Sequence, residues 1–158
     1  MTASAPATSP RRHELLERAY RYALEHGVAD LSLRPLAAAV GSSPRVLLFL
    51  FGSKAGLVQA LLARARRDEL ELLERARAGG DLIAVVTQLW GWLAAEERRG
   101  LLKLWVEGYA RSLIEPDGPW AGFADATVAD WLDLLATGDL DRTTAAVARQ
   151  LELVGSGR

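Results

Sequence analysis

Apolar residues recur at intervals of three and four positions along most of this chain. The first such run consists of Leu15, Leu16, Ala19, Tyr22 and Ala23. Gly27 follows it, and the pattern is typical of an amphipathic helix that ends at a glycine. Because no convincing run of alternating β-branched residues competes with this periodicity, the sequence predicts an all-α fold.

Serine, proline and glycine residues mark the ends of the helices that follow. Ser32 is expected to cap a second helix that Gly41 ends. Ser43 is expected to cap a short third helix, with Pro44 at its first position and its end near Gly52. Further helices are expected over residues 54–78, 82–93, 98–114, 123–136 and 143–154.

The long helix over residues 54–78 has an apolar stripe and a charged remainder. The stripe is formed by Leu57, Leu61, Ala65 and Leu72. The charged side chains expected largely outside the stripe are Arg64, Arg66, Arg67, Glu69, Glu71 and Glu74. This division predicts a helix that packs along one face and is solvated along the other.

The composition excludes several kinds of site. The chain has no cysteine, which rules out disulfides and thiolate metal sites and favours a reducing cytoplasm. His13 and His26 are more than three turns apart on one expected helix, so they form neither a metal site nor a catalytic pair. The sequence therefore predicts a protein that is not an enzyme and needs no metal or cofactor.

No membrane or export segment is expected. The longest uninterrupted apolar run, Val46 to Phe51, is six residues, far below the roughly twenty that span a bilayer. Residues 1–10 have neither a basic start nor an apolar stretch, so they predict a flexible arm and not a secretory signal. We expect a cytoplasmic protein.

Charge is distributed unevenly along the chain. Residues 1–67 carry ten basic and four acidic side chains, a net charge of +6. Residues 68–158 carry nine basic and sixteen acidic ones, a net charge of −7. This division predicts an N-terminal part that binds a polyanion and a separate helical body.

The two short helices expected at Ser32 to Val40 and Ser43 to Phe51 lie in the basic half. They are joined by a glycine-containing turn and preceded by a packing helix, which is the spacing of a helix-turn-helix unit. Such a unit places its second helix in the major groove of DNA. We therefore interpret residues 11–54 as a DNA-binding domain.

This region resembles the signature block of the TetR-type (TetR/AcrR) transcriptional regulators. The matching stretch is SLRPLAAAVGSSPRVLLFLFGSKAGL, from Ser32 to Leu57. Gly41 matches the turn glycine, Ser43 opens the recognition helix, and Phe51 to Lys54 match the aromatic, turn, serine and lysine ending. With the preceding helix included, the resemblance covers about Leu15 to Leu62.

The resemblance implies which residues contact DNA. Arg34 and Lys54 would hold phosphates, and the groove-facing residues would be Ser43, Pro44, Arg45, Leu48 and Phe49. The residue chemistry agrees, because Lys54 lies at a helix N-terminus that favours phosphate and Arg45 can contact guanine bidentately. Arg12, beside the arm, would add a backbone or minor-groove contact.

The resemblance further implies that residues 55–158 form a helical domain that binds a small effector and dimerises. The expected pocket residues are Trp90, Leu93, Trp105, Tyr109 and Phe123, since aromatic walls suit an apolar ligand. Aromatic residues at helical spacing also fill cores, and that interpretation stays open. Because only residues 132–158 follow Trp131, we expect one family helix to be missing or replaced.

The resulting hypothesis is a homodimeric regulator, most simply a repressor, that binds a palindromic operator in double-stranded DNA and is released by a small apolar effector. The family usually carries hydroxyl or imidazole groups where this chain has Val46, Leu48 and Phe49. An exposed apolar helix of this kind is also typical of a protein contact. A helical interaction protein on a regulator-like scaffold is therefore the alternative.

Overall fold

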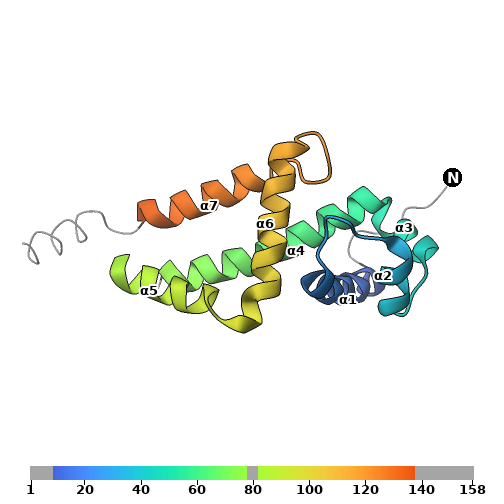
Figure 1. Ribbon diagram of the computed structural model, residues 1–158, viewed down its shortest axis with the longest axis horizontal. Helices are drawn as coiled ribbons and strands as arrows, with labels where there is room; N and C mark the ends of the chain where they lie inside the picture. The colour runs from blue at the N-terminus through green and yellow to red at the C-terminus, as the bar shows by residue number, and fades with distance from the viewer. Residues whose placement is uncertain (1–8, 78–81, 138–158) are drawn as a thin grey trace, which may run out of the picture.

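The computed structural model describes residues 9–77 and 82–137, and every regular element in these residues is helical (Figure 1). The elements are α1 (Pro10–His26), α2 (Leu33–Ala39), α3 (Pro44–Phe51), α4 (Lys54–Arg77), α5 (Leu82–Leu93), the short 3-10 helix η1 (Glu96–Arg98), α6 (Arg99–Ile114) and α7 (Phe123–Thr137). The all-α expectation is confirmed. Residues 1–8 of the expected arm and the helix expected over 143–154 lie outside the described residues. The last two residues of the expected arm belong to the start of α1, because Ser9 caps this helix and Pro10 is its first residue.

The helix ends follow the local signals in the sequence, with one exception. The Ser43 hydroxyl accepts the backbone N–H of Val46, and the Ser53 hydroxyl accepts that of Gly56. Ser32 occupies the N-cap position of α2 in an extended conformation, but its side chain makes no capping hydrogen bond. The expectation that the Ser32 hydroxyl caps α2 is therefore wrong.

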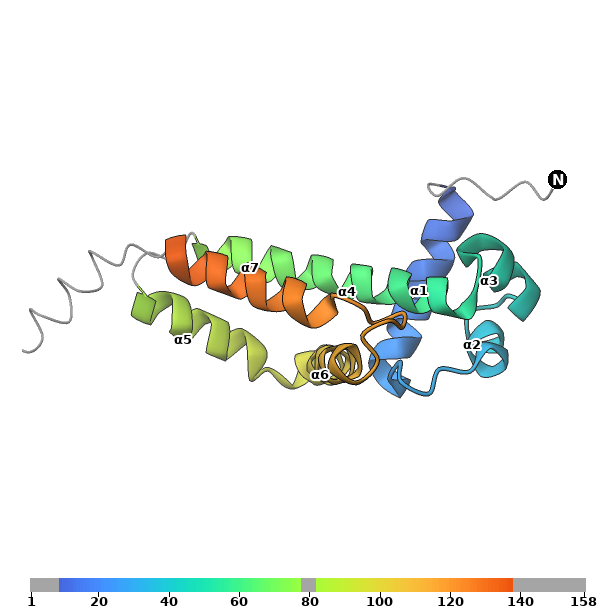
Figure 2. The ribbon, with the colours of Figure 1, turned by 90° about the horizontal axis from the view of Figure 1, so that it is seen from above.

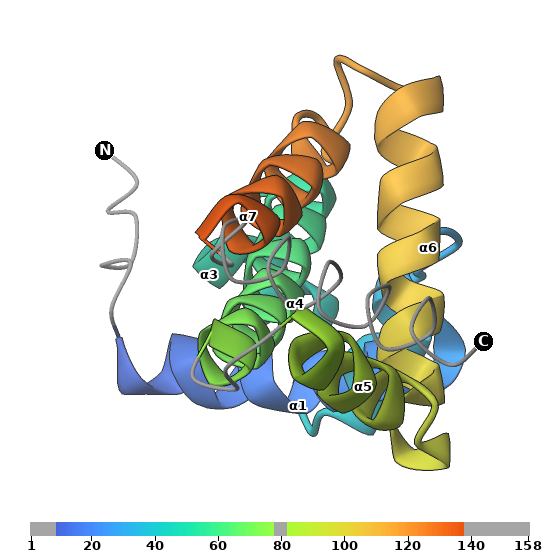
Figure 3. The same ribbon diagram turned by 90° about the vertical axis from the view of Figure 1, so that its left-hand side faces the viewer.

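Helices α1, α2 and α3 pack around the first turns of α4 at one end of the molecule, which we call the head (Figures 1 and 2). Helix α4 leaves the head and runs to the opposite end, where α5 and α7 lie along it. Viewed end-on, α7 and α5 lie against α4, and α6 stands upright to one side of them (Figure 3). We call α5, α6, α7 and the second half of α4 the body.

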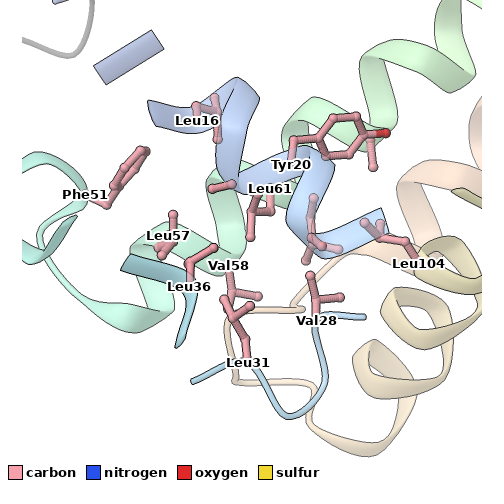
Figure 4. Close-up of a cluster of buried hydrophobic side chains, with 14 of the residues drawn as sticks. Leu16, Tyr20, Val28, Leu31, Leu36, Phe51, Leu57, Val58, Leu61 and Leu104 are labelled. Carbon is pink, nitrogen blue, oxygen red and sulfur yellow. The ribbon is translucent and has the colours of Figure 1, made fainter. Parts of the chain in front are cut away.

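The main hydrophobic core joins the head to the body. Side chains of α1, α2, α3 and α4 meet there with Leu104 of α6 (Figure 4). Trp120 and Phe123, which flank the start of α7, are buried in the same core. Because α6 and α7 contribute to the core that the head needs, the two parts are mechanically connected.

A second, smaller core lies at the far end of α4. It consists of Leu72, Leu73, Ala76, Val85, Leu89 and Leu134, with Trp92, Leu93, Trp105 and Trp131 packed against it. These residues come from α4, α5, α6 and α7. The stripe expected on α4 is buried along its whole length, from Leu57 to Leu72.

Two glycines of α6 permit its close crossing over the neighbouring helices. A Cβ atom at Gly100 would lie 2.4 Å from the carbonyl oxygen of Leu24 in α1. A Cβ atom at Gly108 would lie 2.9 Å from Leu62 of α4 and 3.0 Å from Phe123. The 2.4 Å distance to a backbone atom leaves no room for a side chain at Gly100, so a larger residue there would push α6 away from α1. At Gly108 a larger residue would require the side chains of Leu62 and Phe123 to shift.

Among residues 9–77 and 82–137, no single helix is both long and apolar enough to cross a bilayer. In this part of the chain, α3 and α4 satisfy the combined requirement of length and apolarity only when they are taken together, and the pair is bent by 70°. The same residues contain no group of three or more His, Asp or Glu side chains placed to hold a metal ion.

Candidate nucleic-acid interface

The turn between α2 and α3 fixes the angle at which the two helices meet. Gly41 has φ of 67°, a left-handed conformation that glycine adopts without steric cost. The backbone N–H of Ser42 then donates to the carbonyl oxygen of Ala37 at 2.9 Å, which closes the end of α2. One residue later Ser43 starts α3, so the turn is as short as the sequence predicts.

Helix α3 packs through one face and exposes the other. Leu47 is fully buried and Phe51 is 8% exposed, and both contact the main core. On the outer side, Val46 and Leu48 are each 38% exposed and Phe49 is 57% exposed. A soluble helix normally places polar residues on such a face, so this arrangement indicates a binding surface.

Arginine and lysine residues lie at the starts of the three helices nearest this surface. Arg34, Arg45 and Lys54 occupy the first turns of α2, α3 and α4, and none of these first turns contains an acidic residue. A helix N-terminus already carries partial positive charge, so a cation there is electrostatically unfavourable in the protein alone. An anion bound from outside would relieve that repulsion.

These three cations have no ion-pair partner among the residues that the structure describes. Arg34, Arg45 and Lys54 are exposed and form no ion pair within the described residues. Most described cations of the body are paired instead, as in Arg66 with Asp130 and Arg99 with Glu96. Three exposed cations without an ion pair in the described residues therefore begin the helices around α3. Arg21, Arg67 and Arg98 also have no ion pair there, and the Arg98 guanidinium lies over the Trp92 ring.

Two other arginines of the head are used inside it. The Arg12 Nε donates to the carbonyl oxygen of Leu50 at 3.2 Å, and its guanidinium lies 4.8 Å from the centre of the Phe51 ring. Arg18 donates to the carbonyl oxygen of Val40 at 3.2 Å. Both side chains extend from α1 and bind the C-terminal ends of α3 and α2, where helix carbonyls favour cations. Arg12, expected to contact DNA, is half-buried and anchors α3.

Comparison with known proteins identifies this head. Residues 15–61 match the family model described as bacterial regulatory proteins, tetR family. Over these residues the head is similar to the TetR family. The match spans α1, α2, α3 and the first turns of α4, which are the elements that build the surface described above.

Three curated relatives resemble more of the chain. They are the HTH-type transcriptional regulators Mb1846 of Mycobacterium bovis (strain ATCC BAA-935 / AF2122/97), and MT1864 and Rv1816 of Mycobacterium tuberculosis (strains CDC 1551 / Oshkosh and ATCC 25618 / H37Rv). Each is 31% identical over 150 residues, which covers 87% of this chain and 62% of the relative. The chain thus spans less than two thirds of their length. No solved structure matches it significantly.

In the body, the five expected pocket residues lie in different surroundings. Trp90 is 70% exposed on α5, and Phe123 is buried in the main core. Trp105 donates its Nε1–H to the carbonyl oxygen of Ala65 at 3.4 Å and stacks on Trp92. Tyr109 is 38% exposed.

A recess of about 390 Å³ lies where α5 turns into α6. Trp90 and Leu93 line it, together with Ala94, Ala95, Glu96, Arg99 and Leu102. Its walls are mainly apolar, and Glu96 and Arg99 at its edge form an ion pair of 3.0 Å. The recess therefore combines two of the residues expected to bind an effector.

Glu69 is the residue whose surroundings the sequence did not predict. It was expected largely outside the stripe of α4, but it is fully buried against α7. Trp131 donates its Nε1–H to Glu69 Oε1 at 2.7 Å, and Thr127 Oγ1 lies 3.5 Å from Oε2. Burial raises the pKa of Glu69, while the indole hydrogen bond opposes this shift. Asp130 raises the pKa further and Arg66 lowers it.

Proposed function

We propose that this protein is a sequence-specific, DNA-binding transcriptional regulator. In this proposal residues 11–54 bind a palindromic operator and residues 55–158 bind a small apolar effector and form a homodimer. The protein acts in the cytoplasm as a repressor that the effector releases from DNA. The names of the three relatives support regulation of transcription for this chain.

One observation carries the DNA-binding part of the proposal. The exposed face of α3 lies among Arg34, Arg45 and Lys54, which have no carboxylate partner in the described residues. Phosphates of duplex DNA supply that missing charge, and they supply it on both sides of a major groove that admits a helix. In this proposal Lys54, at the start of α4, binds a phosphate, because helix N-termini favour anions.

The dimer is supported by a stripe of exposed apolar residues on α7. Val128, Leu132 and Leu135 are 42%, 61% and 46% exposed, and their spacing places them on one side of the helix. A second copy of the chain would bury this stripe. A two-fold dimer would also place two α3 helices about one DNA turn apart.

The effector is supported by the recess at the α5 to α6 corner. Its volume of about 390 Å³ and its apolar lining suit a small, largely apolar molecule. Such a ligand would change DNA affinity only to the extent that it binds one arrangement of the helices better than the other.

The deciding experiment is a titration of the full chain against genomic DNA fragments at two salt concentrations. We expect tight, fragment-selective binding that weakens steeply with salt, because phosphate contacts release counterions. Arg45→Ala should reduce selectivity between fragments. Lys54→Ala should weaken binding to all fragments and lower the slope of log affinity against log salt by about one.

Arg75→Ala is the matched control, because it removes one exposed arginine at the far end of α4 and leaves the head unchanged. It should leave affinity and salt slope near their original values. Binding that is unselective and equally affected by all three substitutions would overturn the proposal. A Phe49→Asp variant that loses a protein complex while DNA binding is unchanged would support the interaction-protein alternative.

A further inference from the structure

The outer face of α3 has an unusual set of side chains for reading DNA. Residues 43–51 read SPRVLLFLF, with one charged side chain and no Asn, Gln, Asp, Glu or His. The single hydroxyl, that of Ser43, accepts the Val46 backbone N–H at 3.2 Å. Arg45 is therefore the one side chain on this helix with several strong hydrogen-bond donors.

Position along the helix brings Arg45 together with two apolar side chains. Leu48 and Phe49 follow Arg45 by three and four residues, so all three share one side of α3. That side lies opposite Leu47 and Phe51, which are buried. Leu48 and Phe49 are 38% and 57% exposed, so the described part of the chain leaves a large share of both side chains open.

Base-edge chemistry then limits what this face can recognise. Adenine is normally read by Asn or Gln and cytosine by Asp or Glu, and the helix has none of these. Arginine reads guanine O6 and N7, and apolar side chains contact the C5-methyl group of thymine. We propose that α3 reads guanine through Arg45 and thymine methyl groups through Leu48 and Phe49. This inference rests on the proposed function and adds which bases the DNA presents.

Charge favours DNA over a protein surface as the occupant of this face. Arg45 itself lies beside Leu48 and Phe49, and Arg34 and Lys54 begin the two adjacent helices. These exposed cations have no ion-pair partner in the described residues. A purely apolar protein partner would lose free energy by burying these cations without a counter-charge. DNA offers phosphates to the cations and thymine methyl groups to Leu48 and Phe49.

Helix geometry sets the spacing between the two kinds of base. Three or four residues of α-helix advance about 4.5 to 6 Å, and successive base pairs are about 3.4 Å apart. The thymine read by Leu48 and Phe49 should therefore lie one or two base pairs from the guanine read by Arg45.

The test begins with a pool of randomised duplexes of about 40 base pairs, which is long enough for two half-sites. Duplexes enriched on the full chain are sequenced and then prepared again with deoxyuridine in place of thymidine, which removes only the methyl groups. We expect enriched guanine with thymine within two base pairs. We also expect deoxyuridine to weaken binding roughly fourfold for each methyl group that the protein buries.

Variants assign the effect to the two side chains. Leu48→Ala and Phe49→Ala should bind the thymidine pool less tightly and lose most of the difference between the two pools. Leu70→Ala is the matched control, since Leu70 is also a 39% exposed leucine but lies on α4 away from α3. Helical circular dichroism confirms that each variant is folded, and the comparison of pools on the unaltered chain needs no variant.

The outcomes separate a failure of this inference from a failure of the proposed function. Salt-dependent DNA binding that is insensitive to deoxyuridine would overturn this inference and leave the proposed function in place. Sensitivity that persists in both Leu48→Ala and Phe49→Ala would place methyl recognition elsewhere and also overturn it. Absence of any enrichment or salt-dependent binding would overturn the proposed function itself, and a protein occupant of α3 would then be the remaining interpretation.

Discussion

Glu107 Oε2 accepts a hydrogen bond from the backbone N–H of Val28 at 2.8 Å. The same oxygen lies 3.3 Å from the backbone nitrogen of Ala29. Glu107 belongs to α6 of the body, whereas Val28 and Ala29 belong to the connection between α1 and α2 of the head. A single carboxylate therefore satisfies two backbone donors that no secondary structure of the head would satisfy.

Replacing Glu107 with Ala should destabilise the protein by about 2 kcal/mol, because a charge-assisted pair of hydrogen bonds is lost and two backbone donors lose their acceptor. Urea unfolding followed by circular dichroism measures this change. Hydrogen exchange at Val28 and Ala29 should accelerate at the same time. Glu97→Ala, at an exposed position of η1, is the control and should change stability by less than about 0.5 kcal/mol. Unchanged exchange at Val28 would show that this hydrogen bond does not connect the head to α6.

Two glycines that both lie within helices should respond to alanine in opposite directions. Gly100→Ala places a Cβ atom 2.4 Å from a backbone oxygen of α1 and should cost about 1 to 3 kcal/mol. Gly91→Ala in α5 meets nothing within 4 Å and should stabilise by up to about 1 kcal/mol, because alanine is the better helix former. Thermal unfolding measures the change in stability of each variant. Equal effects of the same sign would mean that α6 does not cross α1 at this glycine.

The buried Glu69 carboxyl should make stability depend on pH. Burial raises the pKa of Glu69 in the folded chain above its unfolded value. Its protonated form therefore favours folding, and that contribution is full below the unfolded pKa of about 4.3 and is lost as pH rises through the folded pKa. Glu69→Gln does not titrate and can still accept the Trp131 indole N–H. Its stability relative to the unaltered chain should increase as pH rises above about 4, as measured by urea unfolding.

Glu71→Gln is the control for this titration, because Glu71 is exposed and pairs only with Arg75 on the same helix. It should show no comparable change across the same pH range. A difference between Glu69→Gln and the unaltered chain that is constant with pH would contradict the assignment to the Glu69 carboxyl.

Adjacent arginines at the start of α1 should differ in importance. Arg12→Ala removes the hydrogen bond to Leu50 and the contact with the Phe51 ring, so we expect a loss of about 1 to 2 kcal/mol. Arg11→Ala removes only an exposed ion pair with Glu14 and should cost less than about 0.5 kcal/mol. Thermal unfolding of both variants tests this. Similar losses in the two would indicate that Arg12 does not anchor α3.

The head was more predictable from the sequence than the body, and the reason is the range of the interactions. Ser43, Pro44 and Gly41 act on backbone groups within a few residues, so their effect on α3 is readable locally. The burial of Glu69 depends on Trp131, which lies 62 residues later, and helical periodicity does not say which helix packs against which. The anchoring role of Arg12 depends in the same way on Leu50, 38 residues away.

The aromatic residues of the body show the same limit. Their spacing indicated helices with apolar faces, and those helices are present. It did not separate Phe123, which is in the main core, from Trp90, which is 70% exposed, because that difference arises from how α5 and α7 lie along α4. A ligand pocket is a property of several elements together and leaves a weak signal in any one of them.

Helix α4 connects the two cores without interruption. It begins at Lys54, beside the exposed face of α3, and continues for 24 residues to Arg77, beyond the buried Glu69. A helix of that length is about 36 Å long, so a tilt of about 5° at the far end displaces the near end by about 3 Å. That displacement nearly equals one step between base pairs. A small change in how α5 and α7 pack against α4 would therefore move Lys54 along a DNA backbone by about one base-pair step.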